Sequence, residues 1–282
     1  MDKSKPYPGS PVEARGQTAT GRVITVTSGK GGVGKTTLTA NLGVALAALG
    51  KKVVTIDADI GLRNLDIIMG LENRIVYDLI DVIEGRCKLR QAMVKHKQYQ
   101  SLYLLPAAQT RDKTALKPVQ MIRLAEALKK EFDFILIDSP AGIERGFQNA
   151  IAAADEVLIV TNPEISSVRD ADRVIGIIEA KSKNIPAHLV LNRIKPEMIK
   201  RGEMLSADDV MEILAIKIIG IIPEDETVLI AGNTGNPGTA AKASIEFNNI
   251  ARRLNGEPIP FPSYDDHPGF FQRLIRMFNN NP

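Results

Sequence analysis

The amino-acid sequence predicts an α/β fold with a single doubly wound, mostly parallel sheet that is flanked by helices. From residue 22 onward, short apolar runs alternate with helical patterns, which is typical of sheets built from strand–helix–strand units. The runs are continuously apolar rather than alternating, as expected for strands that are covered on both faces. With 282 residues, of which 44% are hydrophobic and 24% charged, the chain has enough apolar content for one large core.

The individual elements follow from these patterns in chain order. The predicted strands share runs of Val, Ile and Leu, and they are Val23–Ser28, Lys52–Asp57, Leu102–Pro106, Phe132–Asp138, Glu156–Thr161, His188–Asn192 and Lys217–Ile222. The predicted helices share a helical pattern outside these runs, and they are Lys35–Leu49, Pro118–Lys130, Ser166–Ser182, Ser206–Ala215, Glu226–Ile230, Ala240–Leu254 and Gly269–Asn280. Gly50 and Gly85 stand where helix C-caps are expected.

The two ends of the chain depart from this pattern and set the predicted domain boundaries. Residues 1–21 mix Pro, Gly, Ser and both charges, so we expect a flexible N-terminal tail before a globular domain at 22–256. The Pro-rich stretch 257–268 is predicted to be a stiff extended linker, and residues 269–282 carry the last helix.

Composition excludes several classes of site. A lone cysteine, Cys87, cannot supply an internal disulfide, a CxxC redox pair or a four-cysteine metal site, and the three histidines are scattered. The sequence shows no apolar stretch near the ~20 residues that a transmembrane helix needs. The first residues lack the apolar centre of a signal peptide, so we expect a reducing interior.

The most informative segment is a glycine-rich loop between the first strand and the first helix. It matches G-x-x-x-x-G-K-[ST] and consists of Gly29, Lys30, Gly31, Gly32, Val33, Gly34, Lys35, Thr36 and Thr37. Glycines let successive backbone N–H groups point at phosphate oxygens, and the helix N-terminus adds partial positive charge. We expect Lys35 to bridge the β- and γ-phosphates, Thr36 to bind Mg²⁺ and Thr37 to reach the α-phosphate.

A dinucleotide-binding site is the alternative interpretation of the same loop. Gly29, Gly31 and Gly34 also spell G-x-G-x-x-G, and Asp57 closes the next strand where a ribose-binding acid would stand. That motif has no use for the Lys-Thr pair, whereas a phosphate-binding P-loop needs both. The strand that ends in Asp138 also resembles a Walker B strand, which holds Mg²⁺ through water. These features favour the P-loop.

A second lysine inside the loop narrows the class. The form K-G-G-x-G-K-T-T, with Lys30 as its first residue, resembles the deviant Walker A motif of the MinD/ParA family of ATPases. In that family this lysine reaches across a dimer interface to the partner's bound phosphates. The alternative is a solvated loop lysine.

The resemblance covers residue 22 to about residue 256. Residues 56–66 look like the family's switch I, and residues 138–142 look like its switch II. Four further segments resemble the MinD branch, the division-site ATPases of bacteria and plastids, and these are 109–113, 161–164, 166–170 and 222–225.

The resemblance and the chemistry of phosphoryl transfer assign roles to polar residues at the strand ends. The expected cofactors are ATP and Mg²⁺. Asp57 and Asp138 would support Mg²⁺ through its waters, and Asp59 would orient the attacking water. By resemblance, the adenine would lie beside Asn192 and the turn that contains Pro223 and Asp225. Any one of Asp57, Asp59 and Asp138 could instead simply cap a loop.

The terminal helix is strongly two-faced. Its apolar arc consists of Phe270, Phe271, Leu274, Ile275, Met277 and Phe278, and its polar side of Gln272, Arg273 and Arg276. Large apolar groups opposite arginines describe a helix that lies in an anionic lipid interface. The MinD branch carries a membrane-targeting helix in this place. A helix docked on its own core is the alternative.

These two ends of the sequence suggest one function. ATP would join two copies into a homodimer, the dimer would present two helices to an anionic membrane, and hydrolysis would release the protein. By resemblance, the partners are a division inhibitor of the MinC type and a topological factor of the MinE type. The location would be the bacterial cytoplasm or the plastid stroma, peripheral on the inner membrane face.

The alternative function is that of a ParA-like partition ATPase that binds DNA rather than lipid. The observation that supports DNA binding is a basic run without acids, which consists of Arg86, Lys88, Arg90, Lys95 and Lys97. Such runs are usually solvated faces, and the terminal amphipathic helix argues for lipid. Nucleic acid is therefore not an expected partner.

Overall fold

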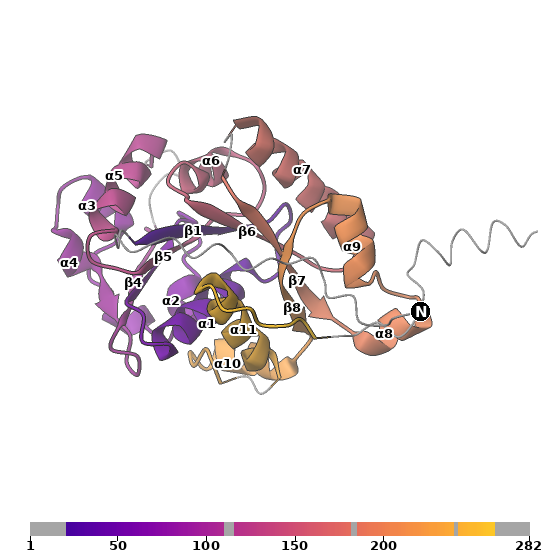
Figure 1. Cartoon of the computed structure of the whole chain (residues 1–282). Helices are drawn as coiled ribbons and strands as arrows, with labels where there is room; N and C mark the ends of the chain where they lie inside the picture. The colour runs from indigo at the N-terminus through magenta and orange to yellow at the C-terminus, as the bar shows by residue number, and fades with distance from the viewer. Residues whose placement is uncertain (1–20, 110–115, 182–184, 240–241, 263–282) are drawn as a thin grey trace, which may run out of the picture.

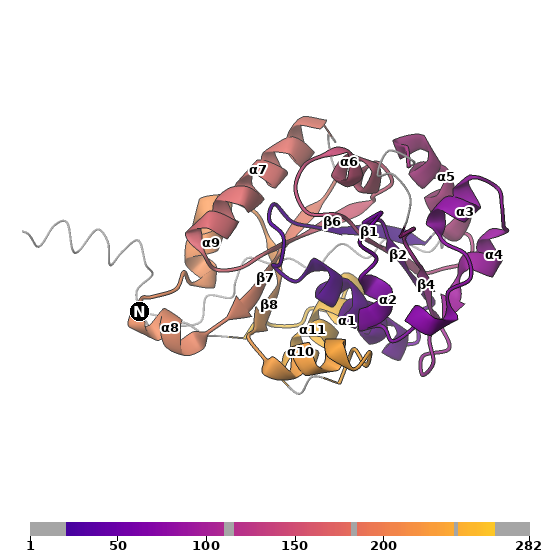
Figure 2. The ribbon, with the colours of Figure 1, turned by 180° about the vertical axis from the view of Figure 1, so that it is seen from behind.

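The fold is a sheet between two layers of helices. The computed structural model describes residues 21–109, 116–181, 185–239 and 242–262. Helices α1, α2, α10 and α11 lie on one face of the sheet, and α3, α5, α6, α7 and α9 lie on the other (Figures 1 and 2). The predicted α/β class with a doubly wound sheet is confirmed. The predicted membrane helix at 269–282 and most of the N-terminal tail lie outside the described residues.

The sheet has eight strands in the order β3-β4-β2-β5-β1-β6-β7-β8. All neighbouring pairs are parallel except β3 and β4, which are antiparallel. The strands are β1 Arg22–Thr27, β2 Val53–Asp57, β3 Val94–Lys95, β4 Leu102–Leu105, β5 Phe134–Asp138, β6 Glu156–Thr161, β7 Ala187–Ile194 and β8 Ile218–Pro223.

The helices of the described residues lie on both faces of this sheet. They are α1 Lys35–Ala48, α2 Leu65–Ile68, α3 Leu79–Ile83, α4 Leu89–Ala92, α5 Pro118–Leu128, α6 Arg145–Ile151, α7 Ile165–Lys181, α8 Pro196–Arg201, α9 Ala207–Leu214, α10 Glu226–Asn233 and α11 Ala243–Leu254, with a 3₁₀ turn at Glu72–Arg74. Among the described residues, none of these helices is long and apolar enough to cross a membrane.

Both faces of the central strands are buried, as the continuous apolar runs predicted. In β1, Ile24 and Val26 pack with α1 and α11, whereas Val23 packs on the opposite side with α5. Because a strand points successive side chains to opposite faces, burial of both sets requires helices above and below.

Several elements differ from the sequence expectation. The short edge strand β3 and the short helices α2, α3, α4, α6 and α8 were not predicted. The strand expected from Phe132 begins at Phe134, and the strand expected to end at Asn192 continues to Ile194. Elements of two to seven residues contain too few positions for a period to show.

The topology gathers the polar residues of interest at one edge of the sheet. Parallel strands β1, β2, β5, β6 and β7 all end at this edge, and the loops that follow them face one another. The central position of β1 places the glycine-rich loop between the ends of β5 and β6.

Candidate functional site

The glycine-rich loop joins the end of β1 to the first turn of α1. Gly32 and Gly34 have φ of 79° and 104°, a left-handed conformation that L side chains rarely adopt. Gly34 is also the N-cap of α1. A Cβ on Gly34 would lie 2.4 Å from the Asn192 side-chain nitrogen, and one on Gly29 would lie 2.2 Å from the Asp170 carbonyl oxygen. Backbone conformation therefore favours glycine at positions 32 and 34, and close packing favours it at positions 29 and 34.

Lys35 lies at the first position of α1 with its side chain turned into the protein. It is only 8% exposed. Burial lowers the pKa of Lys35, and the nearby carboxylates of Asp138 and Asp59 oppose this effect. A buried cation at the end of a glycine loop is suited to binding phosphate oxygens.

Asp57 and Asp138 stand side by side at the ends of adjacent strands β2 and β5, where they are in register. Both are almost fully buried. Burial raises the pKa of Asp57 to about 6, although backbone N–H groups of Asp59 and Leu65 donate to its carboxylate and partly offset the shift. Burial and the charge of Asp57 raise the pKa of Asp138 to about 8.

The oxygen atoms of Thr36, Asp57 and Asp138 are ligands that suit Mg²⁺. Thr36 hydrogen-bonds to the Asp138 carboxylate, and the Thr39 hydroxyl donates to the same group at 3.4 Å. Mg²⁺ keeps several of its waters and is usually held by one or two carboxylates together with substrate phosphates.

Lys30 differs from Lys35 in being exposed. Its ammonium lies 3.8 Å from the Glu164 carboxylate and 3.5 Å from the hydroxyl of Ser166, which is in the first turn of α7. The Lys30 and Glu164 side chains are 45% and 55% exposed, so this ion pair is weak. The side chain is therefore available to a second molecule at little cost.

The predicted adenine residues lie on β7 and at the end of β8. The Asn192 amide donates to the Val33 carbonyl at 2.7 Å and so ties β7 to the loop. Pro223 pairs with Ile194 in the sheet. A groove of about 570 Å³ is lined by residues that include Glu164, Arg193, Lys195 and Glu224, but by none of the predicted adenine residues.

Asp225 has a structural role that the sequence did not reveal. Its carboxylate caps α10 by accepting from Thr227, and it also accepts from the backbone N–H groups of Lys242 and Ala243 at the start of α11. Partial burial opposes ionisation, but these hydrogen bonds together lower the pKa of Asp225 to about 2.

The structure adds residues to the site that the sequence analysis missed. Thr39 contacts Asp138, Asp170 packs on Gly29, and Glu164 contacts Lys30. Thr39 lies one helical turn after Lys35, and this spacing was the available signal for it. Contacts from α7 come from a segment more than 100 residues away, and short-range sequence patterns cannot reveal them.

Comparisons with known proteins agree with this architecture. A family model described as an AAA domain matches residues 21–191. The septum site-determining protein MinD of Bacillus subtilis is 51% identical over 262 residues, which cover 92% of this chain and 98% of the relative.

Two solved structures are similar over most of the chain. The MinC:MinD cell division protein complex of Aquifex aeolicus has a TM-score of 0.79 and 54% identity, covering 86% of this chain and 99% of that one. The septum site-determining protein MinD of Pyrococcus horikoshii complexed with Mg-ADP has a TM-score of 0.74 and 30% identity, covering 83% and 96%. With the loop, the paired aspartates and these similarities together, the chain belongs to the MinD family of septum site-determining proteins, within the P-loop ATPases of the deviant Walker A group.

Proposed function

We propose that this chain is an ATP-dependent, dimerising, membrane-associated ATPase that places the division site. In this proposal the ATP-bound dimer recruits a division inhibitor to the membrane, and ATP hydrolysis releases it. The observation that carries the proposal is the pair of lysines in one loop, with Lys35 buried toward the candidate phosphate site and Lys30 exposed beside α7.

The residues at the strand ends divide the chemistry of hydrolysis among them. Lys35 and the loop N–H groups bind and orient the phosphates, and Thr36, Asp57 and Asp138 would hold Mg²⁺ through oxygen atoms and water. When bound, Mg²⁺ supplies charge neutralisation at the phosphates. Asp59, which follows β2 by two residues, orients the attacking water. Phosphoryl transfer to water needs little more than this positioning and charge.

The adenine base would lie near Asn192 and Pro223. Asn192 is fixed against the loop by its bond to Val33, which holds it beside the candidate phosphate site. Asp225 would shape this turn as a helix cap, since its carboxylate already accepts several hydrogen bonds.

A second copy would complete the site. Lys30 would leave its weak contact with Glu164 and reach the partner's phosphates, where its charge offsets the charge that develops in the transition state. Hydrolysis would then depend on dimerisation.

The membrane contact is assigned to the predicted helix at 269–282. One such helix binds weakly, by analogy with a single acyl chain, whereas two in one dimer gain avidity of ~10²–10⁴. The MinC:MinD complex from Aquifex aeolicus supports an inhibitor of the MinC type as partner. A topological factor of the MinE type is proposed on family resemblance.

The test measures phosphate release with and without phosphatidylglycerol-containing vesicles. We expect vesicles to stimulate release by the unaltered chain, and we expect Lys30→Ala to lower the stimulated rate more than tenfold while retaining nucleotide binding. Lys200→Ala, which removes an exposed, ion-paired lysine on α8, is the matched control and should behave as the unaltered chain. Full activity of Lys30→Ala would refute the proposed role of the partner lysine.

DNA binding receives no support from the basic run. Arg86 pairs with Asp81 and Glu84, and Arg90 pairs with Glu131, so part of the positive charge is neutralised on the chain itself. An ATP-dependent shift of duplex DNA on a gel would favour the partition alternative.

A further inference from the structure

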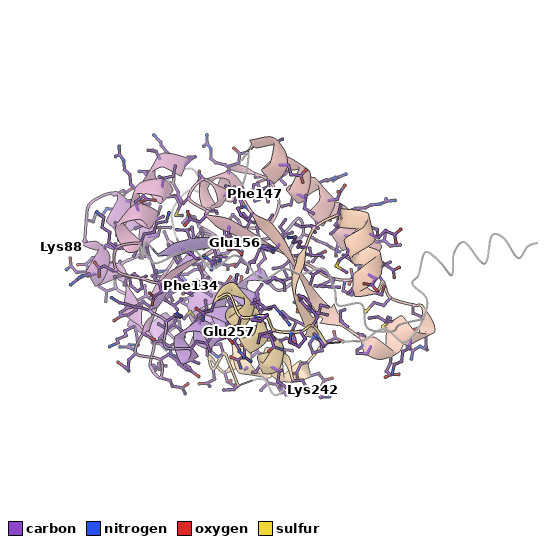
Figure 3. All side chains as sticks on the ribbon, in the orientation of Figure 1. Lys88, Phe134, Phe147, Glu156, Lys242 and Glu257 are labelled. Atoms are coloured by element: carbon purple, nitrogen blue, oxygen red, sulfur yellow. The ribbon has the colours of Figure 1, made fainter. Side chains whose placement is uncertain are left out.

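The chain after α11 turns and lies on the body instead of leaving it. Gly256 has a φ of 88°, and the Glu257 N–H donates to the Arg252 carbonyl at 3.0 Å, which reverses the chain at the helix end. Glu257 lies against the ribbon of α11 (Figure 3), and the chain then runs toward β8 (Figure 1). We call residues 257–261 the strap.

One buried arginine holds the strap. The Arg253 guanidinium donates to the carbonyls of Ile259 and Pro260 in the strap, at 3.0 and 2.7 Å, and to that of Ile219 in β8, at 2.9 Å. The Phe261 ring lies 4.0 Å from the guanidinium carbon. Arg253 thereby joins the strap to both α11 and the edge of the sheet.

This arrangement carries an energetic cost that a simple spacer would not require. The Arg253 side chain is only 7% exposed and lies 3.5 Å from the equally buried Glu246. Burial lowers the pKa of Arg253 and raises that of Glu246, which reflects the penalty of removing both charges from water. Three directed carbonyl contacts and the ring contact offset this penalty.

The end of α11 is fixed as well. The Arg22 guanidinium donates to the Leu254 carbonyl and pairs with the buried Glu156 of β6. The point at which the strap begins is therefore tied to the central strands.

We propose that the strap, held against α11 and β8 by Arg253, fixes the point at which the C-terminal segment leaves the globular domain. Of the predicted linker 257–268, which has 12 residues, the strap takes 5 and 12 − 5 = 7 remain as tether. Effective concentration falls as the −3/2 power of tether length for a flexible linker and more steeply for a stiff one, so a docked strap gives the two helices of a dimer at least about twofold more avidity than an undocked linker. This inference rests on the proposed function, and it makes Arg253 a positioning residue.

The test uses Arg253→Met in the full chain. Amide hydrogen exchange at residues 257–261 should rise, and binding to phosphatidylglycerol-containing vesicles in ATP should weaken at least about twofold. Binding in ADP should stay unchanged, because a single helix does not depend on tether length, and ATP turnover without vesicles should also stay unchanged. Phe261→Ala, outside the helix, is the second variant if Arg253→Met fails to fold, and it should give the same pattern.

Two controls separate tether length from other effects. Arg252→Ala removes the exposed pair with Glu257 and should leave both measurements unaltered. A five-residue Gly-Ser insertion after Pro262 lengthens the tether and leaves the Arg253 contacts intact. It should reproduce the loss of vesicle binding in ATP without the rise in hydrogen exchange at 257–261.

Two results would overturn the role of the strap. One is unchanged exchange at 257–261 in Arg253→Met, and the other is unchanged vesicle binding in ATP despite faster exchange. Equal vesicle binding by the unaltered chain in ATP and in ADP would instead refute the proposed function, and with it the proposed role of the strap.

Discussion

At the scale of single residues, the paired aspartates Asp57 and Asp138 show why the site needs a cation. Two carboxyl groups buried next to each other cannot both ionise cheaply, and the pKa of each is raised, to about 6 and about 8. Their arrangement stores unfavourable electrostatic energy that a bound Mg²⁺ would relieve.

This arrangement predicts a pH dependence of stability for protein stripped of nucleotide and metal. A carboxyl whose folded pKa is raised binds more protons in the folded than in the unfolded state, so its contribution is present below about pH 4 and is lost as pH rises through about 8. Asp138→Asn should flatten this loss and raise the free energy of unfolding at pH 8. Urea denaturation from pH 5 to pH 8 in a chelator measures it.

The same substitution should have the opposite effect on function, because Asn cannot supply the charge that supports Mg²⁺. Mg²⁺-dependent nucleotide affinity should fall at least tenfold. If Asp138→Asn lost stability equally at pH 5 and pH 8, the electrostatic account of this pair would be wrong.

Among the site residues, the glycine loop and the strand-end aspartates could be predicted because each leaves a local mark. The loop has a fixed spacing, and Asp57 and Asp138 each close an apolar run. The contact of Asp225 with the start of α11 could not be predicted, since its partners Lys242 and Ala243 lie 17 and 18 residues further along the chain.

At the scale of elements, long segments were predictable and short ones were not. Helices α1 and α7 and strand β6 carry enough residues for their patterns to be recognised. By contrast, α2 exists because Asp57 accepts from the backbone N–H groups of Asn64 and Leu65 at its start, which is a tertiary contact. The sequence predicted a linker at 257–268 and could not show that its first residues are docked. The Arg253 side chain holds them through the backbone carbonyls of Ile259 and Pro260, which leave no mark in the sequence.

A contact between two glycines joins α2 to the end of α10. Gly70 and Gly235 have φ of 63° and 64°, and a Cβ on Gly235 would lie 2.5 Å from the Gly70 Cα. Both the conformation and the backbone of the neighbour oppose a side chain here.

Gly235→Ala should therefore lower the free energy of unfolding by about 2–4 kcal/mol, from left-handed strain together with overpacking. Gly85→Ala is the matched control, because Gly85 has a φ of 73° and a Cβ there would meet nothing within 4 Å among the described residues. It should cost about 1 kcal/mol. Equal losses in urea denaturation would show that the glycine contact contributes nothing beyond backbone strain.

At the scale of the whole molecule, the fold separates the candidate nucleotide site from the start of the C-terminal segment. The nucleotide residues gather where the parallel strands end, and the strap leaves from the far end of α11 against β8. In the proposed function, dimerisation links them, because the nucleotide decides whether one or two C-terminal segments act together.

The most direct measurement is vesicle binding as a function of protein concentration, in ATP and in ADP. With phosphatidylglycerol-containing vesicles, the account predicts a steep, cooperative rise in ATP, since two copies must join before either is retained. In ADP it predicts a weak and non-cooperative rise. Curves of the same shape and midpoint in both nucleotides would contradict the account.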